Sequence, residues 1–284
     1  MSQPHVLTAF SPEEIDAFSP TMKIGLLATI NPEGLPHLTL VASLQANSPT
    51  QMIFGQFTEG MSKKHVRQDP KVGWLIMTLD RQLWRGKATF THTAQQGPEF
   101  EMYNNTPMFR YNAYFGVHTV FFLDLLEHTG GLPLPMGRVV FAAIQTKIAR
   151  AHAPRRAQEP VLTPWTCQRL NKLDTLKFLS SVGIDGFPRL IPAIQAMTAG
   201  NDQIIYSTGA FGDDLLAIPE GATVAVFGMS LQMEDALMRG SYLGLRRIAG
   251  IRCGTVEVNW VYNPMPPKPQ QIYPKISVEP VTTF

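Results

Sequence analysis

The segment MSKKHV, residues 61–66, places a serine and two lysines where a short helix is expected to begin. Backbone N–H groups in the first turn of a helix have no partner within the helix and carry a partial positive charge. Ser62 adds a hydroxyl group, and Lys63 and Lys64 add two ammonium groups. Together these groups could hold a phosphate, because charge-assisted hydrogen bonds to an anion are strong. The alternative that the segment alone allows is a solvated basic turn.

Short strands separated by turns surround this basic segment. Apolar and alternating runs predict strands at residues 23–30, 35–45, 51–57, 72–79 and 83–92. The first two are joined by the turn NPEG, where Gly34 is free to adopt a left-handed conformation. The segment SPEEIDAF predicts a short helix, with Ser11 as its cap and Pro12 at its first position. The helix that begins with MSKK should end before Pro70.

The same series of predicted elements occurs twice along the chain. A helical pattern at residues 162–176 and strand patterns at 177–184, 187–197, 203–209, 222–231 and 236–245 follow in the same order. A repeat of this length indicates two related domains, since solenoid repeats have periods of roughly 20–50 residues. The matched positions are Gly34 with Gly186, Ile53 with Ile205 and Val72 with Val224, 152 residues apart in each pair, and Arg85-Gly86 with Arg239-Gly240, 154 residues apart.

The composition is that of a two-domain globular protein. Its 284 residues exceed the usual domain length of roughly 100–150 residues, and 44% of them are apolar. The formal net charge of +2 gives no reason to expect a nucleic-acid partner. The two cysteines form no CxxC motif, and the N-terminus lacks the pattern of a signal peptide, so we expect a reduced, cytoplasmic protein. The most apolar region, residues 114–131, is too short and too often interrupted by charge to span a membrane.

A linker is expected between the two copies. Residues 99–105 suggest a helix, residues 117–126 suggest the last strand of the first copy, and residues 136–151 suggest an amphipathic helix. The following segment RAHAPRRAQEPVLTP is rich in charge, alanine and proline. We therefore place the domain boundary near Ala157, which gives a first domain of residues 1–157 and a second, diverged domain of residues 158–284.

The first copy resembles the pyridoxamine-phosphate-oxidase-like family of flavin-binding split β-barrels. The resemblance rests on LLATINPEGLPHLTLV, IFGQF, MSKKHVRQDPKV and RQLWRGKA, and it covers residues 24–91 well and residues 178–245 by fold pattern only. It implies a mainly β fold with short helices, built as two tandem split β-barrels that form an intramolecular pseudo-dimer. Barrels of this family usually pair as homodimers with flavin at the interface, so the resemblance implies one flavin held between the two halves.

The resemblance also implies roles for individual residues. Lys63 and Lys64 would hold the phosphate of flavin mononucleotide (FMN) with help from Ser62, and Gln82 would contact the flavin ring or its polyol chain. Trp84 would either cover an aromatic ring or simply pack in the half-buried strand. The remaining residues that would touch or line the flavin are Thr39, Val41, Gln56 and Phe57.

The second copy lacks the basic segment. Where the first copy reads TEGMSKKHVRQDP, the second reads TGAFGDDLLAIP, with Asp213 and Asp214 near the place of the lysines. A carboxylate repels a phosphate dianion and donates no hydrogen bond to it. We therefore expect one flavin site per chain, with the second copy acting as a built-in partner.

The function expected from this sequence is that of an FMN-dependent oxidoreductase acting on a small organic substrate, with no catalytic side chain identified. In such enzymes the flavin supplies the redox chemistry. The alternatives are a deazaflavin-dependent reductase and a non-catalytic flavin or haem binding or sensor protein, in which His118 or His128 could be an axial ligand. No ligand-spaced histidine pair indicates a metal site. A small-molecule substrate is expected as partner, with no nucleic acid and no membrane, and a homodimer of whole chains stays open.

Overall fold

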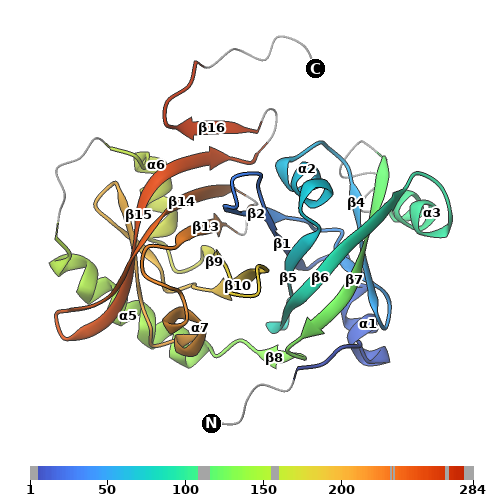
Figure 1. The fold of residues 1–284 in the computed structure, drawn as a ribbon. Coiled ribbons are helices and arrows are strands. Elements are labelled where there is room, and N and C mark those ends of the chain that lie inside the picture. Colours follow the sequence, from blue (N-terminus) through green and yellow to red (C-terminus); the bar gives the residue numbers. More distant parts are fainter. Residues whose placement is uncertain are drawn as a thin grey trace. The chain divides into compact units, whose positions relative to one another are not determined.

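The structure is a computed structural model that describes residues 6–107, 116–154, 160–230, 232, 234–265 and 269–277 of the 284-residue chain. The chain divides into two compact units, and most of their elements are labelled in Figure 1. Unit 1 consists of Met1–Leu134 together with Val182–Leu190. Unit 2 consists of Pro135–Ser181 together with Ile191–Phe284. Both units are mainly β with short helices, as the sequence predicts.

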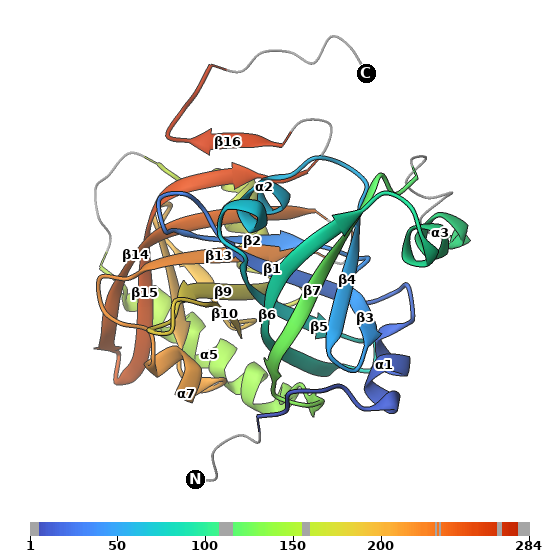
Figure 2. The same ribbon diagram turned by 45° about the vertical axis from the view of Figure 1, so that its right-hand side comes forward.

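Unit 1 is built on one eight-stranded antiparallel sheet. Seven strands lie in the spatial order β2-β1-β5-β6-β7-β4-β3, and β8 pairs with β6. The long strands β6 and β7 curl as they cross the unit, which Figure 2 shows from a second direction. In chain order the elements are α1 (Pro12–Phe18), β1 (Ile24–Ile30), β2 (Pro36–Leu40), β3 (Gln45–Ser48), β4 (Gln51–Gln56), α2 (Met61–Gln68), β5 (Lys71–Met77), β6 (Gln82–Ala94), α3 (Pro98–Asn105), β7 (Thr119–His128) and β8 (Leu132–Pro133).

Unit 2 is built on a second eight-stranded antiparallel sheet. Its strands lie in the order β10-β9-β13-β14-β15-β12-β11, and β16 pairs with β15. The turn between β9 and β10 falls in the segment Val182–Leu190 that belongs to unit 1. In chain order the elements are α5 (Met136–His152), α6 (Pro164–Leu170), β9 (Leu176–Val182), β10 (Pro188–Pro192), β11 (Met197–Ala199), β12 (Gln203–Ser207), α7 (Gly212–Leu216), β13 (Thr223–Met229), β14 (Asp235–Ile248), β15 (Ile251–Asn263) and β16 (Gln270–Tyr273).

The two sheets share one topology. Each strand of the seven-strand path in unit 1 is matched in unit 2 by the strand numbered eight higher, in the same spatial order. The residue register repeats as well, because Leu27 pairs with Trp74 in unit 1 and Leu179 pairs with Val226 in unit 2, an offset of 152 residues on both strands (179 − 27 and 226 − 74). The predicted duplication is confirmed, and with it the predicted fold of two tandem split β-barrels.

One predicted correspondence is two residues out of register. The sequence suggests that Gly86 matches Gly240, but Val72 lies opposite Ala88 in unit 1, and Val224 lies opposite Gly240 in unit 2. Gly240 therefore corresponds to Ala88. The β-bulge lies between Lys87 and Ala88 in unit 1 and between Arg239 and Gly240 in unit 2, so Gly240 borders it and Gly86 does not. A Cβ atom on either glycine would nevertheless clash with a glutamate carbonyl oxygen of the next strand.

Some predicted bounds are wrong: the strand predicted at residues 35–45 ends at Leu40 and Gln45 begins a separate strand, and the helix predicted at residues 162–176 covers only Pro164–Leu170.

Other local signals begin and end the elements as predicted. Ser11 and Glu14 form a capping box at the start of α1, in which each side chain accepts a hydrogen bond from the backbone N–H of the other residue. Gly34 and Gly186 adopt φ angles of 77° and 75° in the equivalent turns of the two units. The helix α2 ends at Gln68, before the proline.

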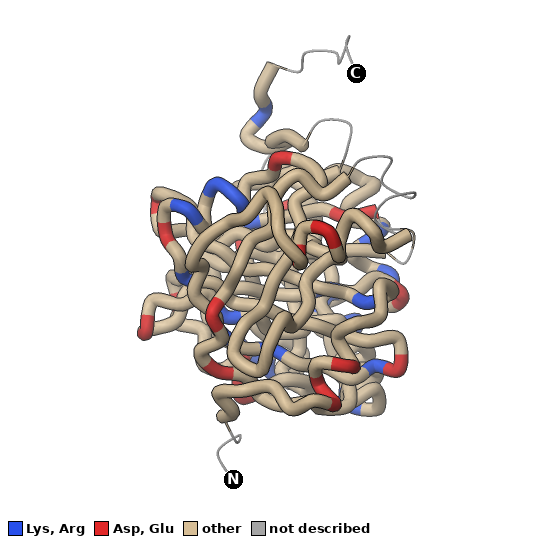
Figure 3. The backbone as a smooth tube through the Cα atoms, turned by 90° about the vertical axis from the view of Figure 1, so that its right-hand side faces the viewer, with Lys and Arg blue, Asp and Glu red and all other residues tan. Residues whose placement is uncertain are grey.

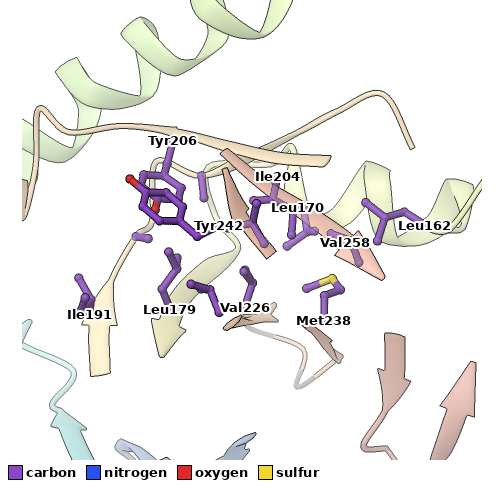
Figure 4. Packing of buried hydrophobic residues seen from close by; sticks show 14 of the residues in the cluster. Leu162, Leu170, Leu179, Ile191, Ile204, Tyr206, Val226, Met238, Tyr242 and Val258 are labelled. Carbon is purple, nitrogen blue, oxygen red and sulfur yellow. The ribbon is translucent and has the colours of Figure 1, made fainter. Parts of the chain in front are cut away.

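Each unit has its own apolar core. In unit 1 the ring of Trp84 meets that of Phe18 edge to face with centroids 5.1 Å apart, and its Nε1 donates to Glu14 Oε1 over 3.0 Å. Trp84 is therefore a packing residue of the core. The core of unit 2, shown in Figure 4, includes the stacked rings of Tyr206 and Tyr242, whose centroids are 6.4 Å apart.

The helix α5 belongs to unit 2. Its Thr146 Oγ1 accepts a hydrogen bond from the Ser207 N–H over 2.9 Å, and Gln145 Oε1 accepts one from the Ser207 hydroxyl over 2.5 Å. Because these contacts tie α5 to β12, the units divide after Leu134, ahead of the predicted boundary near Ala157, which lies outside the described residues. Within the described ranges, no helix is long and apolar enough to cross a membrane.

Candidate functional site

The first turn of α2 has no capping side chain. Its N-cap residue is Gly60, and the turn contains no acidic residue. The N–H of Lys63 bonds back to the Gly60 carbonyl over 3.2 Å, whereas the N–H groups of Met61 and Ser62 have no partner within the helix. The positive end of the helix dipole is therefore available to an anion from outside the helix.

Ser62 anchors this turn to the sheet. Its hydroxyl shares a hydrogen bond with the hydroxyl of Thr39 on β2, over 2.5 Å. Ser62 is buried and Thr39 is half-buried. The helix lies beside β1 and β2, as Figure 1 shows. Two of the predicted cofactor residues, from distant parts of the sequence, are thus in direct contact.

A layer of buried polar side chains continues from this pair. His65 follows Ser62 by three residues on α2, and His37 precedes Thr39 by two residues on β2, so each residue lies on the same face as its neighbour. The rings of His37 and His65 meet edge to face with centroids 5.0 Å apart. Thr29 Oγ1 on β1 lies 3.2 Å from His65 Nδ1. The contact between helix and sheet is therefore polar here, and it fixes the position of the first turn of α2.

Lys63 lies over the start of α2. Its Nζ would lie 3.4 Å from a Cβ placed on Gly60, so the ammonium group folds back toward the N-cap. Burial lowers the pKa of Lys63 to about 8, against the opposing attraction of Glu59. Within the described part of the chain, Nζ forms no hydrogen bond or ion pair. The ammonium group of Lys63 is partly desolvated and lies beside N–H groups that have no partner within the helix. A bound anion would therefore stabilise it.

Lys64 has different surroundings. Its side chain is 66% exposed, and its Nζ lies 3.5 Å from Glu59 Oε2, which is also exposed. An exposed ion pair of this kind adds little energy. The structure therefore separates the two predicted phosphate ligands into a partly buried group at the helix start and a solvent-exposed one.

The predicted residues of the central strands have mixed placements. Gln56 ends β4, is buried, and its carbonyl accepts from the His118 N–H over 2.9 Å. Phe57 follows it and packs on the small apolar cluster around Tyr103. Both residues lie at the start of the loop that leads to α2. The side chain of Val41, in contrast, is 5% exposed and packs in the main core of unit 1.

Gln82 lies away from the other predicted residues of unit 1. It begins β6, where it pairs with Pro133 of β8. Residues paired across neighbouring strands form a row, and the row that contains Thr39 includes Gly86 of β6. Gly86 lies four positions after Gln82 on that strand. Four residues of a strand span about 13 Å. Within unit 1, therefore, the fold does not bring Gln82 to the turn that contains Ser62 and Lys63.

The equivalent helix of unit 2 carries the opposite charge. The helix α7 has five residues, begins after Phe211, and contains Asp213 and Asp214 in its first turn. These residues occupy the second and third helical positions, which Ser62 and Lys63 occupy in α2. Carboxylates at a helix start stabilise that helix and repel an external phosphate.

The histidines considered as haem ligands make contacts within the chain. His128 is buried, its Nε2 donates to the Ala9 carbonyl over 3.1 Å, and its Nδ1 accepts from the Gly130 N–H over 3.2 Å. Both ring nitrogens of His128 are therefore already used, which does not fit an axial ligand. Nδ1 of His118 lies 2.8 Å from Thr119 Oγ1. A search of the described residues finds no group of three or more His, Cys, Asp or Glu side chains that could hold a metal ion.

Sequence reasoning did not identify His65 and Thr29 as parts of this site. The sequence signal was a pair of matching patterns. His37 and Thr39 are two residues apart on a strand and so share one face, and Ser62 and His65 are three residues apart on a helix and so share one face. Such a match becomes visible only once the helix is known to lie on that strand.

The residues at the start of α2 fit a phosphate group. They offer two backbone N–H groups, the hydroxyls of Ser62 and Thr39 and the ammonium of Lys63, with no carboxylate in the first turn. Glu59, which precedes the N-cap, lies beside Lys64, and basic and acidic positions are likewise interspersed along the backbone in the view of Figure 3. The donor set suits an oxygen-rich dianion better than a metal ion or a neutral ligand.

No protein-family model and no curated protein matches the chain. Solved structures that resemble part of it include FMN-binding and pyridoxamine 5'-phosphate oxidase-like proteins. An FMN-binding protein from Syntrophomonas wolfei is 12% identical, with a TM-score of 0.36, over 43% of this chain and 83% of that one. A candidate pyridoxamine 5'-phosphate oxidase from Lactobacillus delbrueckii is 16% identical, with a TM-score of 0.35, over 43% and 94%. General Stress Protein 26 from Bacillus anthracis is 12% identical, with a TM-score of 0.31, over 43% and 94%.

Proposed function

We propose that the protein binds FMN through its phosphate at the start of α2, and that it is an oxidoreductase acting on a small organic substrate. The observation that carries the proposal is the surroundings of Lys63. Burial lowers its pKa despite the attraction of Glu59, its ammonium group forms no hydrogen bond or ion pair among the described residues, and helix amides lie beside it. An anionic ligand would restore the favourable electrostatics that burial removes.

The residues of the first turn would share the work of binding. The N–H groups of Met61 and Ser62 and the ammonium of Lys63 would donate hydrogen bonds to phosphate oxygens. Thr39 would hold Ser62 in position, and the polar layer beneath would keep the turn against the sheet. When bound, FMN would supply the transfer of hydride or electrons, for which the protein need provide only position and electrostatics.

The binding experiment compares FMN with riboflavin, which lacks the phosphate. We expect FMN to bind about 10- to 100-fold more tightly, as charge-assisted hydrogen bonds to one phosphate allow. Equal affinities would exclude a phosphate site at α2. The visible spectrum of the freshly purified protein identifies the ring system, because a flavin and a deazaflavin absorb at different wavelengths.

Turnover decides whether the flavoprotein is an enzyme. The bound flavin is mixed with NADH or NADPH under anaerobic conditions, and small organic acceptors are then added. Reduction followed by reoxidation by an acceptor would support the oxidoreductase. A flavin that binds tightly but is reduced by neither donor would instead indicate a carrier or sensor.

A further inference from the structure

Unit 2 contains a buried carboxyl group that is not explained by the fold. Asp235 begins β14 and is 9% exposed. Its Oδ1 is fully buried and has no hydrogen-bond partner among the described residues. Its backbone N–H points to the sulfur of Met265, 3.4 Å away. A buried carboxylate without a partner costs free energy, so its presence calls for a reason.

The duplicated fold provides an internal reference for this position. Asp235 pairs with Met229 in unit 2, and Leu83 pairs with Met77 in unit 1, so the two residues are equivalent at the offset of 152 (235 − 83). Leu83 is 5% exposed. In unit 1 an apolar side chain therefore occupies the equivalent position, so the fold does not require a carboxyl group there.

Asp235 lines a pocket with mainly apolar walls. The pocket has a volume of about 200 Å³, enough for a small organic molecule. It is lined by Thr163, Trp165, Thr166, Asp235, Ala236, Val261, Tyr262, Asn263, Met265 and Ile272. Burial raises the pKa of Asp235 to about 6, so the group is mostly ionised at neutral pH.

Within the described ranges, no basic side chain forms an ion pair with Asp235. Glu234, the residue before it, forms an ion pair with Arg169. The guanidinium of Arg169 also lies over the ring of Trp165, 5.6 Å from its centroid. Among the described residues that line the pocket, Asp235 is the one with an ionisable carboxyl group.

We propose that this pocket binds a small organic amine in its protonated form. The ammonium group would donate a hydrogen bond to Asp235, and an aliphatic or aromatic body would fill the apolar walls. The pairing follows from chemistry, because a carboxylate in an apolar pocket is best stabilised by a cation that brings its own apolar surface.

The test measures binding of benzylamine and of benzyl alcohol to the full-length protein by isothermal titration calorimetry at pH 7.5. The two probes have nearly the same shape, but only benzylamine carries a positive charge. We expect benzylamine to bind one site per chain, at least about tenfold more tightly than benzyl alcohol. Equal affinities, or no binding of either probe, would overturn the proposal.

Two variants assign the effect to the carboxylate. Asp235→Asn keeps the size, and Asp235→Leu installs the residue of unit 1; each should weaken benzylamine binding at least about tenfold. Undiminished binding to Asp235→Asn would overturn the proposal. Thermal unfolding is the folding control: we expect Asp235→Leu to melt at or above the wild-type temperature, since the unpaired carboxylate is removed. A lower melting temperature would show that the carboxylate supports the fold, and would also overturn the proposal.

Discussion

Two adjacent lysines of α2 differ in what surrounds their ammonium groups. Lys63 folds over the N-cap glycine and is partly desolvated, while Lys64 extends into solvent beside Glu59. An ion is bound more strongly by a charge that water does not screen. The sequence predicts that both lysines hold the phosphate; from these surroundings we expect Lys63 to contribute more binding energy than Lys64 at the proposed site.

Replacement of each lysine by alanine tests this difference. We expect Lys63→Ala to weaken FMN binding about 10- to 100-fold, the range for a charge-assisted hydrogen bond. Lys64→Ala is the matched control and should change the affinity by less than about fivefold, as for an exposed ion pair. Fluorescence titration of the apoprotein with FMN measures both. A larger loss for Lys64→Ala would reverse the assignment.

The lowered pKa of Lys63 predicts a pH dependence of FMN affinity. The phosphate is mostly a dianion above about pH 6. Lys63 attracts the phosphate only while its ammonium group is protonated, and the pKa of this group is about 8 in the free protein. We therefore expect the affinity to be nearly constant from about pH 6.5 to 7.5, and to fall above pH 8 by up to about tenfold per pH unit.

The control for this pH dependence is Lys63→Arg. An arginine stays charged throughout this range, so its affinity for FMN should not fall between pH 7 and pH 10. A fall of the same size in the variant would assign the titration to another group.

The residues of the site were predictable to different degrees. Ser62 and Lys63 were accessible from sequence because helix-start chemistry depends on neighbouring residues only. Thr39 was assigned by resemblance, and its bond to Ser62 depends on where α2 lies. His65 was missed because its partner Thr29 is 36 residues away in the chain. Local chemistry could be predicted, whereas contacts between elements could not.

At the level of elements, alternation and turn residues were sufficient to locate most strands, because β-strands and their turns have strong local signals. Register was harder to predict. Gly86 and Gly240 look equivalent in sequence, yet the ladder matches Gly240 with Ala88. The β-bulge lies at the equivalent place in both units, between Lys87 and Ala88 and between Arg239 and Gly240, so only the position of the glycine differs, by two residues.

Gly86 and Gly240 should both be intolerant of a side chain. A Cβ on Gly86 would lie 2.0 Å from the Glu127 carbonyl oxygen, and one on Gly240 would lie 1.9 Å from that of Glu257. We expect Gly86→Ala and Gly240→Ala each to destabilise the fold by about 2 kcal/mol or more, because backbone must move to relieve the clash. Denaturant unfolding measures this free energy.

Gly137→Ala is the control for these substitutions. Gly137 lies in the first turn of α5, and no atom lies within 4 Å of an added Cβ. Alanine is a better helix former than glycine, so stability should be unchanged or higher by up to about 1 kcal/mol. If Gly86→Ala or Gly240→Ala were as stable as this control, the two strands would be able to move apart at little cost, which would contradict the prediction.

At the level of the whole molecule, duplication was predictable but the division of the chain was not. The repeat offset and the order of elements could be read from the sequence. The sequence could not show to which unit α5 belongs, since an amphipathic helix between two domains can pack on either of them. Its hydrogen bonds to Ser207 decide the question, and they involve residues more than 60 positions apart.

The charge difference between α2 and α7 predicts the stoichiometry of the whole chain. Unit 1 has Ser62 and Lys63 at the helix positions where unit 2 has Asp213 and Asp214. Because a phosphate dianion is attracted by the first pair and repelled by the second, we expect equilibrium dialysis of the apoprotein to give one FMN per chain. Lys63→Ala should weaken this single site, and Asp213→Asn should leave both its affinity and the stoichiometry unchanged. Two equal sites would contradict the assignment, because the second would lie at a helix start that carries two carboxylates.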